Sequence, residues 1–348
     1  MNKLRAKLLK NTTIADTTIL TESKFYTEKD MVPTDYPMIN VALSGSINGG
    51  ITPGITQIAG QSKHFKTMFA LLLASAYLKH HPDSMMLFYN SEFGSPISYF
   101  DFFNIDVENR VVHSPLMNIE QLKFDAVKQL EGLERGDKAI VVIDSIGNLA
   151  STKELQDALS EKNIAEVGTR AKALKSFFRM VTPYFTMKNI PCVIVNHTYK
   201  TLELYSKDVV SGGTGSYYSS ENIWVVGRQQ EKEKVEGENK VVGYNFIINV
   251  EKSRYVKEKS KIPISVLWNG GIQKHSGMVD LALEAGFLTK SGRSFRLVDK
   301  DGVINENVKI TNEDLETDEF WNKFLTETTF SDWISKKYAI ADLGKDKL

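Results

Sequence analysis

The chain has 348 residues, of which 42% are hydrophobic and 25% charged, with 43 basic and 43 acidic side chains. This length allows one large α/β domain with extensions, or two domains, and the composition is that of an ordinary globular protein. A formal net charge of zero excludes a uniformly basic nucleic-acid coat, although it leaves room for a local basic channel. The single cysteine, Cys192, excludes an internal disulfide and is expected to be a small buried hydrophobe.

Short apolar strands alternate with helices in the first 200 residues. A strand is expected at 55–60 and a helix at 66–79, because Ala, Leu and Met dominate the second segment and Pro82 lies just beyond it. Further strands are expected at 85–89, 139–145 and 191–197, and further helices at 118–133, capped by Asn118, and 169–188. This alternation predicts an α/β fold with a mostly parallel central sheet covered on both faces.

The pattern becomes β-rich after residue 220. Three β segments are expected at 221–228, 241–252 and 262–269, and the charged stretch 229–240 between the first two is expected to be a solvated hairpin loop. The longest apolar run, 68–78, is too short to span a membrane and predicts a buried helix, so no membrane partner is expected.

The two ends of the chain look like extensions of a core. Residues 1–12 predict a short basic amphipathic helix, and residues 312–333, which are acidic and aromatic, predict a small helical cap. The expected organisation is an N-terminal oligomerisation segment and linker at 1–30, a core at 31–270 and an α-rich region at 271–348.

Residues 60–67, GQSKHFKT, nearly match the phosphate-binding pattern G-x-x-x-x-G-K-[ST]. Gly60, Lys66 and Thr67 satisfy it, whereas Phe65 stands where glycine is expected, so the loop is a working ATP site, a decayed one or a coincidence. Backbone N–H groups cradle the phosphates, and phenylalanine fits if residue 65 has helical φ/ψ and its ring turns away. The candidate nucleotide ligands are Gly60, Gln61, Ser62, Lys63, His64, Phe65, Lys66 and Thr67.

Two carboxylates follow other strands. Asp144 ends the strand AIVVI and Glu92 follows MMLFY, so both are expected at the carboxyl edge of the sheet, beside the loop. Asp144 and the Thr67 hydroxyl are expected to hold Mg²⁺. Glu92 is expected to orient and deprotonate a water that attacks the γ-phosphate. Either carboxylate alone would most often be a surface charge.

Segments along most of the chain resemble one family. They include NVALSGSINGG, SKHFKT, LFYNSEFG, VIDSIGNLAS, KNIPCVIVNHTY, GGTGSYYS and NVEKSRYVKEKSK. These segments resemble the RecA recombinase superfamily, most closely the UvsX-type recombinases of T4-like bacteriophages, which also carry a bulky residue before the loop lysine. The resemblance favours a working loop and implies a RecA-like core that uses ATP and Mg²⁺. It also implies helical filaments on single-stranded DNA, pairing with double-stranded DNA and strand exchange, in the cytoplasm of the host cell if the source is viral.

The resemblance also implies further nucleotide contacts. Tyr99 falls where the family stacks an aromatic ring on adenine, and His197 falls where many relatives have a glutamine that senses the γ-phosphate. Lys252 and Arg254 match a basic pair that reaches the ATP of the neighbouring subunit. Without the resemblance, each would be read as a packing or solvated surface residue.

Two segments would face DNA in the family, about 151–168 and 198–213. Residues 153–210 carry nine Lys or Arg against six Asp or Glu, a modest local bias in a neutral chain. The expected DNA contacts, which also admit a reading as local packing, are Arg170, Lys172, Arg179, Tyr199, Leu202, Tyr205, Gly212 and Gly213.

Three functions compete. The first is a DNA-dependent ATPase and strand-exchange recombinase that assembles with itself and meets single-strand-binding and mediator proteins. The second is a recombination mediator that binds nucleotide without turnover, which Phe65 and His197 favour. The third is a hexameric helicase with the same core fold, which the long segment before Gly212 and Gly213 and the N-terminal segment disfavour.

Overall fold

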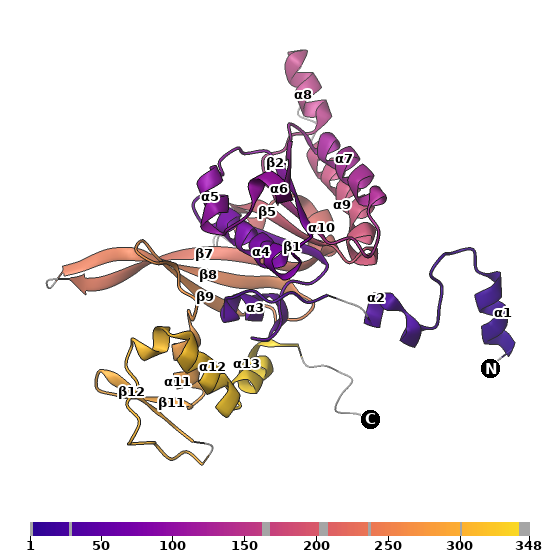
Figure 1. Ribbon diagram of the computed structural model, residues 1–348. Helices are drawn as coiled ribbons and strands as arrows, with labels where there is room; N and C mark the ends of the chain where they lie inside the picture. The colour runs from indigo at the N-terminus through magenta and orange to yellow at the C-terminus, as the bar shows by residue number, and fades with distance from the viewer. Residues whose placement is uncertain are drawn as a thin grey trace.

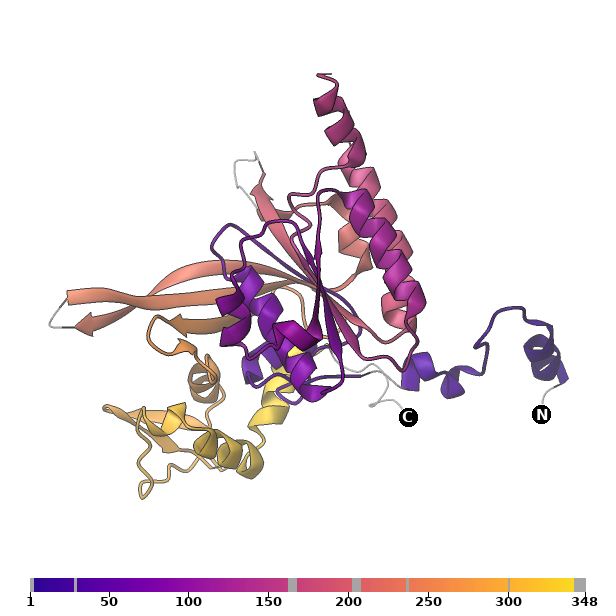
Figure 2. The ribbon, with the colours of Figure 1, turned by 45° about the horizontal axis from the view of Figure 1, so that its top comes forward.

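The computed structural model describes residues 3–27, 30–161, 168–201, 208–235, 238–299 and 301–340. A central sheet with helices on both sides forms the body, a long two-stranded hairpin projects from it, and the N-terminal helices lie apart from it (Figure 1). Figure 2 shows the same arrangement with the two helical layers on opposite sides of the sheet.

The central sheet has the strand order β10-β9-β8-β7-β1-β5-β4-β2-β3, with β6 paired to β5. The strands from β7 to β3 in this order are parallel to their neighbours, and β8, β9 and β10 add antiparallel to β7. The strands are β1 Gly54–Gly60, β2 Met85–Asn90, β3 Val111–Pro115, β4 Ala139–Asp144, β5 Pro191–Lys200, β6 Asp208–Val210, β7 Ser220–Val235, β8 Glu238–Ser253, β9 Lys261–Leu267 and β10 Gly271–Ile272. The mostly parallel sheet expected from the sequence is confirmed.

Two helical layers cover the two faces of the sheet and bury its apolar side chains. Along β4, Ile140 and Val142 pack into one core with α4, while Val141 and Ile143 pack into the other with α7 and α9. Both faces are covered, which explains why the central strands are continuous apolar runs. The core helices are α3 Pro37–Ser44, α4 Lys66–His80, α5 Ile97–Phe102, α6 Val107–Arg110, α7 Ile119–Gly132, α8 Thr152–Leu159, α9 Thr169–Met187 and α10 Gly213–Ser219.

The expected helices and strands of the core agree with the structure within one to three residues at their ends, and Asn118 caps α7 by accepting from the N–H of Gln121 at 2.8 Å. The short strands β3 and β6 were not expected, because their sequences, VVHSP and DVV, carry little apolar pattern.

The charged stretch 229–240 is not a loop, contrary to the expectation. β7 continues to Val235 and β8 begins at Glu238, and the two strands stay paired to their ends. Beyond the β8–β9 pairing at Gly243 no third strand lies alongside in the described residues, and the neighbouring Lys232 and Glu233, on opposite faces of the hairpin, are both exposed. Charged residues suit such a ribbon, because backbone pairing does not require a buried face.

The two ends differ in how firmly they attach. Helix α1 (Lys3–Asn11) buries no side chain, and its Leu4 and Leu8 are more than half exposed. The short helices η1 (Leu20–Glu22) and α2 (Lys24–Thr27) lead toward the body (Figure 1).

The C-terminal region packs around a buried aromatic cluster of Trp321, Phe324 and Phe330. Its elements are α11 Met278–Glu284, β11 Leu288–Ser291, β12 Ser294–Leu297, η2 Asp314–Glu316, α12 Asp318–Glu327 and α13 Phe330–Tyr338. The helical cap is present, but a two-stranded sheet of β11 and β12 accompanies it. The segment boundaries near residues 30 and 270 stay predictions.

Cys192 lies within β5 at 1% exposure, and burial raises the pKa of its thiol. Its side chain therefore acts as the small buried hydrophobe expected from the sequence. Among the described residues, no helix combines the length and apolar character needed to cross a bilayer.

Candidate active site

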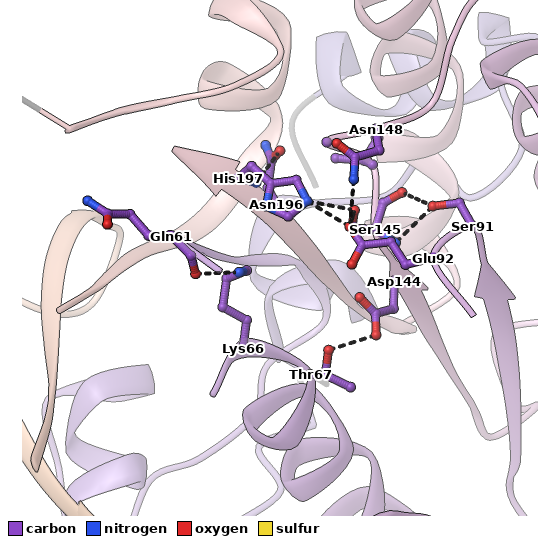
Figure 3. Close-up of polar contacts among 12 residues, drawn as sticks. Gln61, Lys66, Thr67, Ser91, Glu92, Asp144, Ser145, Asn148, Asn196 and His197 are labelled. Atoms are coloured by element: carbon purple, nitrogen blue, oxygen red, sulfur yellow. Dashed lines mark hydrogen bonds and ion pairs between the residues drawn. The ribbon is translucent and has the colours of Figure 1, made fainter. Parts of the chain in front are cut away.

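Four strands bring the candidate nucleotide residues to one edge of the sheet. Gly60 at the end of β1 pairs with His197 on β5, and Asn90 at the end of β2 pairs with Asp144 at the end of β4. Parallel strands present their carboxyl ends on the same edge, so the loop after β1 lies beside the residues that follow β2, β4 and β5 (Figure 3).

The loop after β1 leads directly into helix α4. Lys66, the first helical residue, is 7% exposed and its Nζ donates to the carbonyl of Gln61 at 2.8 Å. Burial lowers the pKa of Lys66, while the charges of Glu92 and Asp144 oppose that shift. The ammonium thus lies within its own loop, close to two carboxylates, where it can meet a phosphate.

Phe65 has a left-handed backbone, with φ 62° and ψ 15°, and so lacks the helical φ/ψ on which the sequence argument relied. Its ring stacks on Phe246 at 4.9 Å and meets the edge of Phe69 at 5.3 Å. The ring therefore packs into the core beneath the loop. Phenylalanine is tolerated here because of these aromatic contacts and not because the backbone is helical.

Asp144 has the surroundings of a metal ligand. Its Oδ2 accepts from the Thr67 hydroxyl at 2.8 Å and from the Ser95 hydroxyl at 3.2 Å. Its Oδ1 is buried and has no hydrogen-bond partner in the described structure, and burial raises the pKa of this carboxyl. An unpartnered carboxylate oxygen beside a threonine hydroxyl fits Mg²⁺, which takes one or two carboxylates and completes its shell with other oxygens. Ser95 carries no motif that would have revealed it.

Glu92 is held by three donors. Its Oε1 accepts from His197 Nε2 at 2.7 Å, from Asn148 Nδ2 at 3.2 Å and from the Ser145 hydroxyl (Figure 3). The hydrogen bond from His197 is the main cause that lowers the pKa of Glu92 to about 2, with a smaller contribution from Ser145. Within the described residues Oε2 accepts no hydrogen bond, so one oxygen is fixed and the other remains available. Ser145 and Asn148 belong to no pattern, and the sequence analysis missed them.

Of the other candidate nucleotide ligands, several loop side chains are exposed, one contacts β7, and Tyr99 lies on α5. Gln61 and Lys63 are exposed, and His64 Nδ1 bonds to the carbonyl of Val226 at 2.7 Å, with burial lowering its pKa. Tyr99 lies in the first turn of α5 with 38% of its surface exposed. Its contact with adenine stays a prediction.

Lys252 and Arg254 lie at the other edge of the sheet. Lys252 pairs with Ile223 on β7, which pairs with Gln57 on β1, three residues before Gly60. Lys252 therefore lies about 10 Å before the loop along the strands, and its ammonium reaches back to Ser220 at the start of β7. Lys252 and Arg254 are not part of the nucleotide site of their own chain.

Both cations are engaged at this edge. Lys252 Nζ donates to the carbonyls of Tyr217 at 2.6 Å and Ser220 at 2.8 Å, which lie at the end of α10. Arg254 Nε pairs with Glu221 at 2.8 Å. An ammonium suits the unpaired carbonyls of a helix C-terminus.

The arginines of α9 divide into one that points inward and one that is exposed. The guanidinium of Arg170 donates to the carbonyls of Ile146, Gly147 and Leu149, each within 3.0 Å. These bonds hold the segment that follows β4. The Arg170 side chain is therefore not free to make the DNA contact that the sequence analysis expected. Lys172 and Arg179 on the same helix are exposed.

Parts of the two expected DNA segments are regular structure. Residues 152–159 form α8, which begins with a capping box between Ser151 and Glu154, and 208–210 form β6 on the end of β5. A serine followed three residues later by a glutamate is the sequence pattern of a capping box, so the start of α8 could have been predicted from it. Leu202 and Tyr205 lie outside the described residues.

Tyr199 is 57% exposed on β5, and Gly212 and Gly213 lead into α10 with φ 102° and 70°. Consecutive positive φ angles suit glycine, which has no Cβ. This backbone forms the end of the second expected DNA segment.

Two family models match the chain. The RecA N-terminal domain matches residues 12–273, and the model described as "Bacteriophage T4, Recombination and repair protein, C-terminal domain" matches residues 275–334. The recombination and repair protein of Enterobacteria phage T4 is 44% identical in a match that covers all of this chain and 89% of that protein. The RecA protein of Heliobacterium modesticaldum is 23% identical over 80% of this chain and 78% of its own length, and that of Aquifex aeolicus is 24% identical over 80% and 78%. The chain therefore belongs to the RecA family, as a recombination and repair protein similar to that of phage T4.

Proposed function

We propose that the chain is a DNA-dependent ATPase that forms a helical filament on single-stranded DNA and pairs it with double-stranded DNA for strand exchange. The observation that carries this proposal is the meeting of Lys66, Asp144 and Glu92 at one sheet edge, beside a loop that opens a helix. RecA proteins and the T4 recombination and repair protein are the named relatives.

The chemistry follows from these side chains. The backbone N–H groups of 60–67 and the ammonium of Lys66 would hold the phosphates of ATP. Thr67 and Asp144 would hold Mg²⁺, which when bound offsets the negative charge of the phosphates. Glu92 would orient the attacking water and accept its proton.

His197 gives the site a means to respond to nucleotide. While His197 donates to Glu92, the carboxylate has a pKa of about 2 and is a weak base. If the imidazole turns to a γ-phosphate, Glu92 loses that hydrogen bond and its basicity rises. His197 also lies on β5, whose end pairs with β6 within the second expected DNA segment.

Self-assembly is supported by the two sheet edges. Lys252 and Arg254 do not reach the loop of their own chain. In a head-to-tail filament, the edge that carries this pair would meet the carboxyl edge of the neighbouring subunit and bring the two cations to the neighbour's loop. There they would stabilise the charge that develops on the transferred phosphoryl group. The exposed helix α1 is proposed to pack on an adjacent subunit.

DNA is proposed to lie along the segments 151–168 and 198–213. Lys172 and Arg179 are exposed for backbone contacts, and the N–H groups of Gly212 and Gly213 are open to phosphates. Tyr199 is exposed for stacking on a base. Arg170 is assigned instead to holding the chain after β4. Single-strand-binding and mediator proteins as partners, and a cytoplasmic location, stay predictions.

A second candidate is a mediator that binds nucleotide without turnover. The observation that favours it is the hydrogen bond from His197 to Glu92, which lowers the pKa of the carboxyl and makes Glu92 a weak base as long as the bond persists.

The test is steady-state ATP hydrolysis with and without single-stranded DNA over a series of protein concentrations. The proposal expects strong stimulation by DNA that rises cooperatively with protein. Nucleotide binding without stimulated turnover would select the mediator, and absence of nucleotide binding would exclude both.

A further inference from the structure

Three successive residues of the phosphate-binding loop are held by the β7–β8 hairpin. The carbonyl of Lys63 accepts from the guanidinium of Arg228 at 3.2 Å, and His64 bonds to the carbonyl of Val226 at 2.7 Å. The ring of Phe65 stacks on Phe246 of β8. We call Val226, Arg228 and Phe246 the hairpin clamp.

The loop needs external support because of its backbone. Lys63 and Phe65 both have φ of 62°, a left-handed conformation that costs free energy for any residue with a Cβ. Glycine adopts the same angle without that cost. A loop with phenylalanine at this position thus depends on contacts that hold it, and those contacts come from the hairpin clamp.

The clamp and the projecting part of the hairpin share one hydrogen-bonded ladder. Arg228 is paired directly with Phe246, and its guanidinium lies 4.8 Å from the ring centre of Tyr244. The pairing continues from there, through a register shift between Glu231 and Lys232, to Val235 and Glu238, past the last pairing with β9 (Figures 1 and 2). A displacement of the projecting strands is therefore transmitted along paired backbone to the residues that hold the loop.

We propose that Arg228 and Phe246 are positioning residues of the phosphate-binding loop and that nucleotide affinity depends, through Phe65, on the placement of the β7–β8 hairpin. This inference rests on the proposed function only in that the loop binds a nucleotide. It assigns the site a control element outside the residues that would touch ATP.

The test is a double-mutant cycle read out by binding of a fluorescent ADP analogue with Mg²⁺ and without DNA. Arg228 is exposed, so Arg228→Ala is expected to fold, which the thermal midpoint checks. We expect Arg228→Ala to weaken ADP binding about fivefold in the parent chain, and less than about 1.5-fold in a background with both Lys63→Gly and Phe65→Gly, because glycine at both positions adopts the left-handed angle without the strain that the clamp offsets. Lys232→Ala, an exposed cation on the same strand, is the matched control and should leave the affinity unchanged.

A charge effect on the nucleotide is the main alternative, and the same cycle separates it. If Arg228→Ala weakens binding equally in both backgrounds, the guanidinium acts directly on the phosphates and the clamp is wrong. Arg228→Lys keeps the charge but loses the planar group, so the clamp predicts an intermediate affinity and the charge effect predicts parent affinity.

Phe246→Leu tests the aromatic half of the clamp. Because Phe246 is buried, its thermal midpoint is measured alongside. The clamp predicts a raised KM for ATP with kcat within about twofold, which identifies a binding effect. No change in ADP affinity in either Arg228→Ala or Phe246→Leu would overturn the inference, as would loss of ADP binding in Phe65→Gly alone. A parent chain that binds no ADP would contradict the proposed function instead.

Discussion

The two edges of the central sheet differ in how complete they are. At the carboxyl edge, Lys66, Asp144 and Glu92 lie together and are already held by hydrogen bonds within the chain. At the opposite edge, Lys252 and Arg254 bind the end of α10 and Glu221, in contacts that have no chemical role of their own.

This difference indicates which edge would have to break existing bonds when subunits assemble. At the carboxyl edge, the candidate nucleotide ligands already lie together within one chain. In the proposed filament, the opposite edge would exchange its intramolecular bonds for bonds to a neighbour, so hydrolysis should depend on contact between subunits in addition to binding of nucleotide.

The largest effect is expected at the carboxyl edge, from Glu92→Gln. The amide keeps the size of the side chain but cannot accept a proton, so turnover should fall at least about 100-fold while ADP and DNA binding persist. ATPase rates and DNA-binding titrations measure this, with the exposed Glu108→Gln as control. Hydrolysis at the parent rate would show that Glu92 is not the base.

Lys252→Ala tests the opposite edge. We expect DNA-stimulated hydrolysis to fall by roughly 10- to 100-fold, because a cation supplied by the neighbour is lost. An equal mixture of Lys252→Ala and Glu92→Gln chains should recover about a quarter of the parent rate, since in a random head-to-tail filament half of the sites keep Glu92 and half of their neighbours keep Lys252. Lys261→Ala is the control. A mixture as inactive as its components would break the distinction between the two edges.

A pair of arginines compares the stability of the edges directly. Arg170→Ala should lower the free energy of unfolding by about 2–3 kcal/mol, because three carbonyls lose a charged donor. Arg254→Ala should change it by less than about 1 kcal/mol, since the Arg254–Glu221 pair has a largely exposed arginine. Urea denaturation at pH 7 measures both. Equal losses of unfolding free energy would mean that the contacts at the two edges stabilise the fold to a similar extent.

The smallest effect is expected in acid. The pKa of Glu92 is lowered from 4.5 to about 2, so its bonds add stability that is complete above pH 4.5 and is lost as the pH falls toward 2. His197→Gln removes the main cause of the shift, so the thermal midpoint of this variant should fall less steeply between pH 5 and pH 3 than that of the parent. Identical slopes would mean that the His197 bond does not hold Glu92 in solution.

The fold and the location of the site were accessible from sequence for a physical reason. Parallel strands buried on both faces leave continuous apolar runs, and their carboxyl ends share one edge, so Asp144 and Glu92 could be assigned to it. Ser145 and Asn148 could not, because small polar residues after a strand occur in most loops. Whether they reach Glu92 depends on backbone detail that no local pattern carries.

Two failures have a common cause. The left-handed backbone of Phe65 depends on contacts with Phe246, far along the chain, and the extended backbone of 229–235 depends on pairing with the adjacent strand β8. Local composition indicates a helix start at Phe65 and a charged loop at 229–235. Cross-strand pairing and the stacking on Phe246 override both indications.

The buried state of Cys192 makes the chain convenient for spectroscopy. A thiol that is 1% exposed and has a raised pKa reacts slowly with maleimides at neutral pH. It is also the only cysteine in the sequence. A cysteine introduced on the hairpin, for example by Lys232→Cys, would therefore accept a fluorophore without replacement of the native Cys192. Hairpin movement on nucleotide addition then becomes observable as a change in the emission of one dye.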